Sequence, residues 1–259
     1  MAQDVLLVAK EGNIATLTIN RPEKRNALSL ELLYRLADAF NALREDSDIR
    51  VVVLRGAGEK AFCSGIDMQY TDAIKVAQED NPINHAIRSV ISCPYPVIAM
   101  IYGAATGAGC DLAVACDLRI AANTAVMGIN PVRIGRVYPP AGIQRLIDVV
   151  GLSRARELFF TGRFVDARRA KEMGLVDHLV AVEELPSFTY ALAREIADNA
   201  PLALSATKTI FNRLLKYQRL SPDDENEIAA LIDKVESSQD AAEGRAAFVE
   251  KRKPRFVGR

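Results

Sequence analysis

Two unbroken apolar segments, Val51–Leu54 and Pro96–Ile101, place the strongest limit on what this chain can fold into. A strand with one face in solvent alternates apolar and polar residues, so unbroken runs predict strands that are buried on both faces. Leu118–Ala122 repeats the strand pattern, and helical patterns lie between the three segments. Strands that alternate with helices are joined by crossovers and pair mostly in parallel. We therefore predict an α/β fold with a mostly parallel sheet.

The N-terminal part adds two strands and a helix to this prediction. Strands are expected at 5–8 and 14–19, and Ser29 is placed to cap an amphipathic helix that reaches Leu43. The apolar stripe of this helix consists of Leu32, Leu33, Leu36, Phe40 and Leu43. Further helices are expected around 82–92 and 108–115.

From about Glu183 the pattern changes to consecutive helices, which Pro201 and Pro222 separate. They are expected at 183–199, 201–217, 223–237 and 240–251. We divide the chain into an α/β core over 1–199 and a helical C-terminal segment over 200–259.

The composition argues against several classes of protein. The 33 basic and 33 acidic side chains give zero net charge, which disfavours nucleic acid or an anionic membrane as the main partner. No run of about 18 apolar residues offers a membrane span. The four cysteines form no C-x-x-C pair, and His85 and His178 lack partners at metal-ligand spacing. Because the first residues also lack the basic region of a signal peptide, we expect a cytoplasmic, reduced protein without a metal.

Two glycine-containing segments follow buried strands and are candidates for exposed backbone N–H groups. The first is 61–67, for which a simple strand-to-helix turn is the alternative, and the second is Gly103–Gly109. The second segment matches neither the P-loop nor the G-x-G-x-x-G pattern, so a phosphate or dinucleotide site is weakly supported. Two separate N–H groups that converge on one oxygen would instead suit a developing oxyanion.

Together these segments resemble the crotonase (enoyl-CoA hydratase/isomerase) superfamily, and the resemblance covers almost the whole chain. Seven motifs occur in the order of that family, at Asn20–Leu28, Phe62–Asp67, Pro96–Leu112, Gly142–Leu146, Thr161–Gly162, Ala170–Val176 and Phe248–Arg252. The resemblance implies a crotonase-type spiral of ββα turns, closed by an all-helical C-terminal segment that forms a homotrimer or a dimer of trimers.

The same resemblance implies an acyl-CoA thioester as the substrate, with coenzyme A carried by the substrate and no separate cofactor. The peptide N–H groups of Ile66 and Ala108 would hold the thioester oxygen and stabilise an enolate. Ala108 replaces the more usual glycine, so its backbone must adopt a conformation that alanine tolerates. The implied CoA contacts are Arg25, Ala27, Ala61, Ser64, Gly65, Phe248 and Lys251, of which the last two would come from a neighbouring subunit.

The catalytic side chains depart from the pattern of standard hydratases, which place one water between two glutamates. Asp111 aligns with the first glutamate and keeps a carboxylate with a shorter reach. The alternative for Asp111 is a favourable charge at a helix N-terminus. Pro131 aligns with the second glutamate and cannot transfer a proton. Since no Asp or Glu occurs from Leu118 to Ile147, we do not expect a two-glutamate hydratase.

Around Tyr138 the sequence is similar to the methylmalonyl-CoA decarboxylase branch, through the pattern P-V-x-x-G-x-x-Y. In that branch the tyrosine faces the departing carboxylate, and decarboxylation needs an electron sink rather than a strong base. Arg133 or Arg136 could attract such an acid. Against this interpretation, the branch has histidine in place of Ile66 and glutamate in place of Asp111. Tyr138 is alternatively a wall of the pocket.

We predict an enzyme of the enoyl-CoA hydratase/isomerase type that acts on an acyl-CoA thioester through an enolate. The single carboxylate favours isomerisation or an atypical hydration, and decarboxylation of a malonyl-type CoA ester is the alternative. A non-catalytic CoA-binding or RNA-binding relative is a further alternative, against which the zero net charge and the retained Asp111 count. The segment Gln69–Ser92 is expected to shape the acyl pocket, but it does not identify the acyl group.

Overall fold

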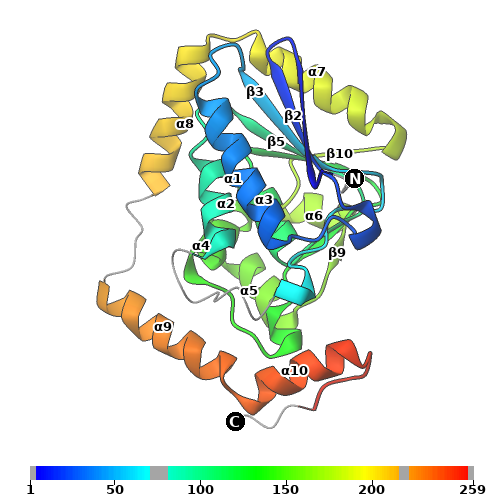
Figure 1. The fold of residues 1–259 in the computed structure, drawn as a ribbon, viewed down its shortest axis with the longest axis vertical. Coiled ribbons are helices and arrows are strands. Elements are labelled where there is room, and N and C mark those ends of the chain that lie inside the picture. The colour runs from blue at the N-terminus through cyan, green and yellow to red at the C-terminus, as the bar shows by residue number, and fades with distance from the viewer. Residues whose placement is uncertain (1–3, 71–80, 216–221, 256–259) are drawn as a thin grey trace.

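The computed structural model describes residues 4–70, 81–215 and 222–255, and a six-stranded sheet lies at its centre (Figure 1). Neighbouring strands pair in parallel, except for the antiparallel hairpin of β1 and β2. In spatial order the strands are β1 (Leu6–Glu11), β2 (Ile14–Ile19), β3 (Val51–Gly56), β5 (Val97–Ile101), β7 (Leu118–Ala122) and β10 (His178–Val180). The predicted α/β fold with a mostly parallel sheet is confirmed.

A second, smaller sheet is built from short strands that follow those of the first. Its order is β4 (Ala61–Cys63), β6 (Ala104–Thr106), β8 (Val126–Gly128) and β9 (Val165–Asp166). Along the chain β3 leads into β4, β5 into β6 and β7 into β8, and a helix or 3-10 turn follows each pair. This repeated order is the expected spiral of ββα turns.

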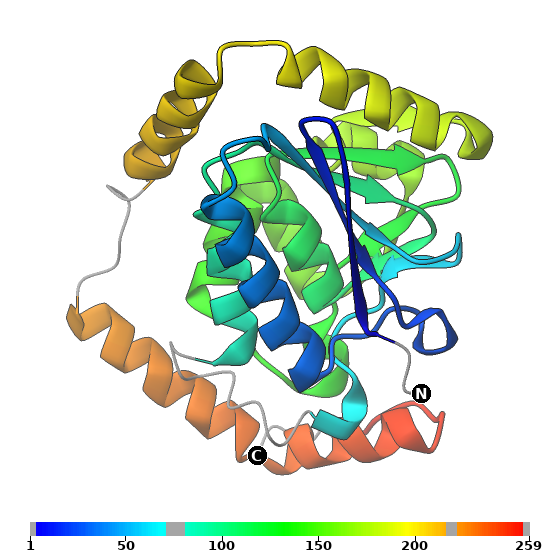
Figure 2. The ribbon, with the colours of Figure 1, turned by 45° about the horizontal axis from the view of Figure 1, so that its top comes forward.

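Helices cover both faces of the large sheet (Figures 1 and 2). On one face α1 (Leu30–Arg44), α2 (Pro82–Ile91) and α3 (Ala108–Val114) pack with Val52 and Leu54. On the other face α7 (Leu185–Ala197) packs with Val51 and Val53. The apolar run at 51–54 is unbroken because its alternate side chains belong to two different cores.

The remaining helices complete the core and form the C-terminal segment. They are α4 (Pro140–Val150), α5 (Leu152–Thr161), α6 (Ala167–Met173), α8 (Pro201–Leu215), α9 (Pro222–Glu236) and α10 (Gln239–Val249). The buried Lys208 ties α8 to the core, because its Nζ donates to the Asp117 carboxylate (2.6 Å) and to the carbonyl of Tyr95 (3.0 Å). At the far end of the chain α10 packs on the 3-10 turn η3 (Pro131–Ile134). None of the described helices is long and apolar enough to cross a membrane.

Most of the predicted elements are confirmed, and their ends differ by a few residues. The hydroxyl of Ser29 accepts from the amide of Leu32 (3.2 Å), as expected of a helix cap. The strand expected at 5–8 instead runs to Glu11, because its pairing with β2 continues to the end of the hairpin. Within the expected pocket segment, residues 71–80 lie outside the described residues, as do residues 216 and 217 of the expected helix 201–217.

Candidate active site

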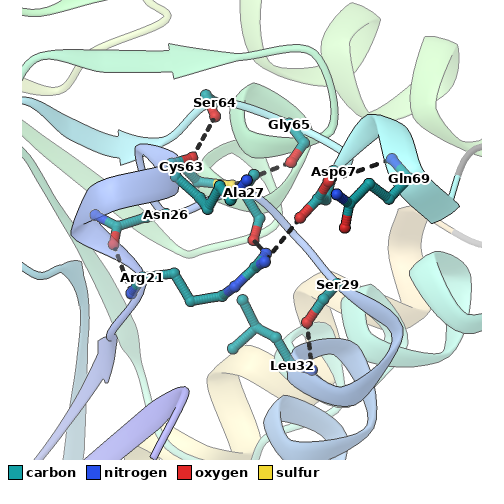
Figure 3. Close-up of polar contacts among 11 residues, drawn as sticks. Arg21, Asn26, Ala27, Ser29, Leu32, Cys63, Ser64, Gly65, Asp67 and Gln69 are labelled. Carbon is teal, nitrogen blue, oxygen red and sulfur yellow. Dashed lines mark hydrogen bonds and ion pairs between the residues drawn. The ribbon is translucent and has the colours of Figure 1, made fainter. Parts of the chain in front are cut away.

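The segment 20–28 lies against the segment 61–67, and hydrogen bonds join the two (Figure 3). The amide of Ser64 donates to the carbonyl of Arg25 (3.1 Å), and the amide of Leu28 donates to the carbonyl of Gly65 (2.8 Å). The side chain of Asn26 donates to the carbonyl of Ala61 (2.7 Å). Five of the residues predicted to contact CoA therefore lie close together, namely Arg25, Ala27, Ala61, Ser64 and Gly65.

A largely buried ion pair between Arg21 and Asp67 holds these two segments together (Figure 3). One Arg21 nitrogen donates to the Asp67 carboxylate (2.7 Å), and another donates to the carbonyl of Ala27 (2.5 Å). Burial acts to raise the pKa of Asp67, but hydrogen bonds from Arg21 and from the amide of Gln69 outweigh it and hold this pKa below its usual value. Sequence reasoning missed this pair, because two motifs so far apart in the chain carry no signal that their charges meet.

Two glycines bring the predicted oxyanion segments into contact. Gly65 has φ +100° and Gly107 has φ +56°, a region that L side chains rarely adopt. A Cβ on Gly65 would lie 3.0 Å from the carbonyl oxygen of Thr106 and 3.5 Å from the amide nitrogen of Ala108. The Thr106 hydroxyl also donates to the carbonyl of Ser64 (3.1 Å). The backbones of the two segments therefore approach each other directly at these glycines.

The amides of Ile66 and Ala108 follow these glycines immediately. In the described part of the chain, neither amide donates to a protein acceptor. Ala108 begins α3, where the first N–H groups of a helix have no internal partner. Its φ is not positive, so alanine adopts this conformation without strain. Two unpaired amides on adjoining turns are suited to bind one negatively charged oxygen.

Beside this turn, Asp111, Tyr138 and Arg145 form a single hydrogen-bonded group. Asp111 lies in the first turn of α3, Arg145 lies on α4, and Tyr138 precedes α4. Arg145 Nε donates to Asp111 Oδ1 (2.8 Å), and an Arg145 terminal nitrogen donates to Oδ2 (2.8 Å). The Tyr138 hydroxyl donates to the same Oδ2 (3.0 Å). The two predicted catalytic side chains are therefore in direct contact, and a third residue binds both oxygens of the carboxylate.

Burial and charge determine the protonation of Tyr138 and Arg145. Burial raises the pKa of the Tyr138 phenol well above its usual value, and the negative charge of Asp111 raises it further. Burial acts to lower the pKa of Arg145, but the adjacent Asp111 charge outweighs it, so that this pKa is raised. Tyr138 is therefore a neutral hydrogen-bond donor, and Arg145 is a cation.

Packing also fixes the ring of Tyr138. Its centroid lies 5.7 Å from that of Phe159, and the backbone of Gly142 also lies against it. A Cβ at Gly142 would overlap the Tyr138 ring and would lie 3.0 Å from Asp111 Oδ2. Sequence reasoning left Arg145 without a role, although Gly142 and Arg145 are three residues apart and share one face of α4. The spacing alone does not show which helix this face meets, so it does not pair Arg145 with Asp111.

The two predicted CoA contacts near the C-terminus lie in a different part of the molecule. Phe248 is half exposed near the end of α10, and Lys251 follows it. In this chain α10 packs on η3, and Arg136 Nε donates to both carboxylate oxygens of Glu236 at the end of α9 (2.9 and 3.0 Å). The approach of Phe248 and Lys251 to the CoA of a neighbouring subunit stays a prediction.

Of the other residues considered from the sequence, Arg133, Arg136 and His178 have partners outside this group. Arg136 binds Glu236, and the exposed Arg133 donates to the carbonyl of Thr161 (3.3 Å). The ring of His178 packs against that of Phe188 at a tilt of 49°, with centroids 5.2 Å apart. Cys63, Cys93, Cys110 and Cys116 are buried free thiols, and burial raises the pKa of Cys110 to about 12. Within the ranges that the structure describes, no three His, Cys, Asp or Glu side chains are grouped to hold a metal ion.

Comparison with known proteins places this geometry in context. Residues 9–259 match the family model of enoyl-CoA hydratase/isomerase. The chain is 35% identical to mouse mitochondrial methylglutaconyl-CoA hydratase, over 97% of this chain and 82% of that protein. A solved structure of methylmalonyl-CoA decarboxylase with 2S-carboxypropyl-CoA is 32% identical over the full length of both chains, with a TM-score of 0.94. An enoyl-CoA hydratase/carnitine racemase from Magnetospirillum magneticum is 36% identical over 100% of this chain and 97% of its own, with a TM-score of 0.80.

Proposed function

Because this chain belongs to the enoyl-CoA hydratase/isomerase family, we propose that it binds an acyl-CoA thioester and stabilises the thioester enolate at the amides of Ile66 and Ala108. The unpaired amides on adjoining turns support this role. Preorganised donors of this kind contribute strongly, since the removal of one lowers turnover about 100-fold or more. The segments 20–28 and 61–67 would then carry the CoA, with no cofactor beyond the CoA of the substrate.

The reaction that the site supports best is decarboxylation of a malonyl-type CoA ester. The observation that carries this conclusion is that both oxygens of Asp111, the carboxylate predicted to be catalytic, already accept hydrogen bonds from Arg145 or Tyr138. A hydratase needs a free carboxylate to activate water. Decarboxylation needs only an electron sink and an oriented substrate. The similarity in fold to methylmalonyl-CoA decarboxylase over the whole chain supports the same reaction.

In this reaction the bond between the α-carbon and the substrate carboxylate breaks. Its electron pair moves into the thioester to give the enolate, carbon dioxide leaves, and the α-carbon then takes a proton from water. The amides of Ile66 and Ala108 would stabilise the enolate oxygen. The hydroxyl of Tyr138 would turn its proton from Asp111 Oδ2 to the substrate carboxylate and so orient the group that leaves.

A second candidate is isomerisation or hydration of an enoyl-CoA, which a different observation favours. The hydroxyl of Tyr138 lies 3.0 Å from Asp111 Oδ2. Tyr138 could therefore take a proton from the substrate while it passes its own hydroxyl proton to Asp111. The methylglutaconyl-CoA hydratase relative acts on an enoyl-CoA according to its name.

Mass spectrometry of a mixed acyl-CoA panel separates these candidates. The panel contains short and medium enoyl-CoAs together with malonyl-CoA, methylmalonyl-CoA and ethylmalonyl-CoA. We expect loss of carbon dioxide from one or more of the malonyl-type esters. Gain of water, or a shifted double bond at constant mass, would make the second candidate correct. Binding of CoA esters without any turnover would support the non-catalytic alternative.

We also propose that the protein works as a homotrimer or a dimer of trimers. Several large apolar side chains of α8 are at least half exposed in the single chain, namely Leu202, Ile210, Phe211, Leu214 and Leu215. An outer helix with such a stripe is typical of a surface that another subunit covers. The four free thiols suit a reducing compartment such as the cytoplasm.

A further inference from the structure

Arg145 is a largely buried cation that the reaction outlined above does not use. Its side chain is 17% exposed, and that of Asp111 is 4% exposed. Two parallel hydrogen bonds of 2.8 Å join the guanidinium to the carboxylate. Such a fork is among the strongest pairings between side chains, and it fixes the plane of the carboxylate as well as its position.

This fork determines what Asp111 can still do. An ionised carboxylate has about four lone-pair positions. Arg145 takes one on each oxygen, and Tyr138 takes a second one on Oδ2. One position on Oδ1 remains, and a proton from the substrate would have to compete there with the positive charge of the Arg145 guanidinium.

We infer that Arg145 is a positioning residue that withholds Asp111 from proton transfer and leaves the Tyr138 hydroxyl as the polar side-chain group that meets the acyl group. This inference rests on the proposed acyl-CoA site, and it excludes the second candidate reaction, in which Asp111 takes up the proton of Tyr138. In this view Arg145 determines whether the site decarboxylates its substrate or removes a proton from it. With the fork intact, the site favours loss of carbon dioxide, and without the fork, Asp111 becomes a base.

A purely structural role of the same pair predicts a different outcome. If Arg145 only joined α3 to α4, its loss would lower stability and turnover together and would create no new activity. The inferred role predicts that a new activity appears when the fork is removed. Exchange of the α-protons of a saturated acyl-CoA is such an activity, because it requires a base but no carboxylate on the substrate.

The experiment measures deuterium uptake by propionyl-CoA in D2O, with mass spectrometry, for the wild type and for Arg145→Gln. In this exchange Asp111 takes an α-proton, the electron pair moves to the thioester oxygen as an enolate, and the carboxyl group returns a deuteron after exchange with solvent. We expect uptake at least about 10-fold faster in Arg145→Gln than in the wild type. Decarboxylation of methylmalonyl-CoA should fall in the same variant.

Three further variants make the result specific. Adding Asp111→Asn to Arg145→Gln should abolish the gained exchange. Arg169→Gln removes an exposed arginine that pairs with Glu157 on the surface, so it should exchange like the wild type. Arg145→Lys keeps the charge but cannot form the fork, so its exchange should lie between the wild type and Arg145→Gln. If thermal denaturation shows that Arg145→Gln is unfolded, Arg145→Lys alone decides, and it must exchange faster than the wild type.

The inference is overturned if the folded variant exchanges no faster than the wild type, or if its exchange survives Asp111→Asn. The proposed reaction fails separately, if the wild type decarboxylates none of the malonyl-type esters. Exchange that depends on Asp111 in Arg145→Gln, together with an inactive wild type, would keep the role of Arg145 and reject the decarboxylase. A wild type that decarboxylates, together with a variant that does not exchange, would keep the decarboxylase and reject the role of Arg145.

Discussion

At the scale of single residues, the neighbours of Tyr138 restrict both its ring and its hydroxyl. Phe159 and Gly142 hold its ring, and Asp111 holds its proton. We expect Tyr138→Phe to lower kcat for decarboxylation about 100-fold with little change in KM, because the substrate still binds but is no longer oriented. Steady-state kinetics would measure this, with Tyr34→Phe on the exposed side of α1 as the control. An unchanged kcat would make Tyr138 a wall of the pocket.

The raised pKa of Tyr138 also predicts how stability depends on pH. The folded state keeps this proton at a pH where the unfolded chain, with an ordinary pKa of about 10, has begun to lose it. The contribution of Tyr138 is therefore complete below about pH 10 and decreases as the pH rises above it. In urea denaturation between pH 8 and 11, the free energy of unfolding should fall more steeply for the wild type than for Tyr138→Phe. Parallel curves would contradict the raised pKa.

At the scale of elements, the Arg21–Asp67 pair connects the proposed CoA segment to the segment that carries Ile66. Breaking a largely buried pair leaves an uncompensated charge, so Arg21→Gln should lower the free energy of unfolding by about 3 kcal/mol. The exposed pair of Arg35 and Asp4 provides the matched control, because Arg35→Gln should change stability by less than about 1 kcal/mol. Chemical denaturation of both variants compares them directly. Equal losses would mean that the connection between the two segments does not depend on this pair.

Some of the helices and strands could be predicted from the sequence, and others could not. The strands β3 and β5 and the helix α1 were predictable, because an unbroken apolar run and a capped apolar stripe are local signals. The second sheet was not, since its strands have only two or three residues, too few for a period to appear. The helices α4 to α6 were likewise not predicted.

In the candidate site, too, some features could be predicted from the sequence and others could not. Residues that the motifs named lie close together, with Arg25 beside Ser64 and with Asp111 beside Tyr138. They gave no sign that Arg145 binds Asp111, because that contact depends on how α4 crosses α3 in three dimensions. The motifs carry residue types in a fixed order, and the pairing of charges is a property of the packed helices.

For the whole molecule, the exposed apolar side chains of α8 predict an assembly. Ile210 and Phe211 are 56% and 62% exposed, and one turn later Leu214 and Leu215 continue the same stripe. We expect light scattering to give three or six times the mass of one chain, and Phe211→Asp to shift it towards one chain. Arg168→Asp, an exposed change on α6, should keep the wild-type mass. A wild-type mass of one chain would reject the assembly and the predicted contacts of Phe248 and Lys251 across subunits.

The contact between α10 and η3 has a consequence for how this enzyme can diversify. A side chain at Gly244 would collide with the backbone of Ile134, and one at Gly135 would collide with that of Asp240. Substitutions in the turn that precedes Tyr138 are therefore tied to substitutions in a helix about 100 positions later. A laboratory that transplants the turn from a relative to obtain another reaction should transplant the last two helices with it. A lineage that changed the turn at 131–135 without a matching change in α10 would be expected to lose the packing that places Tyr138.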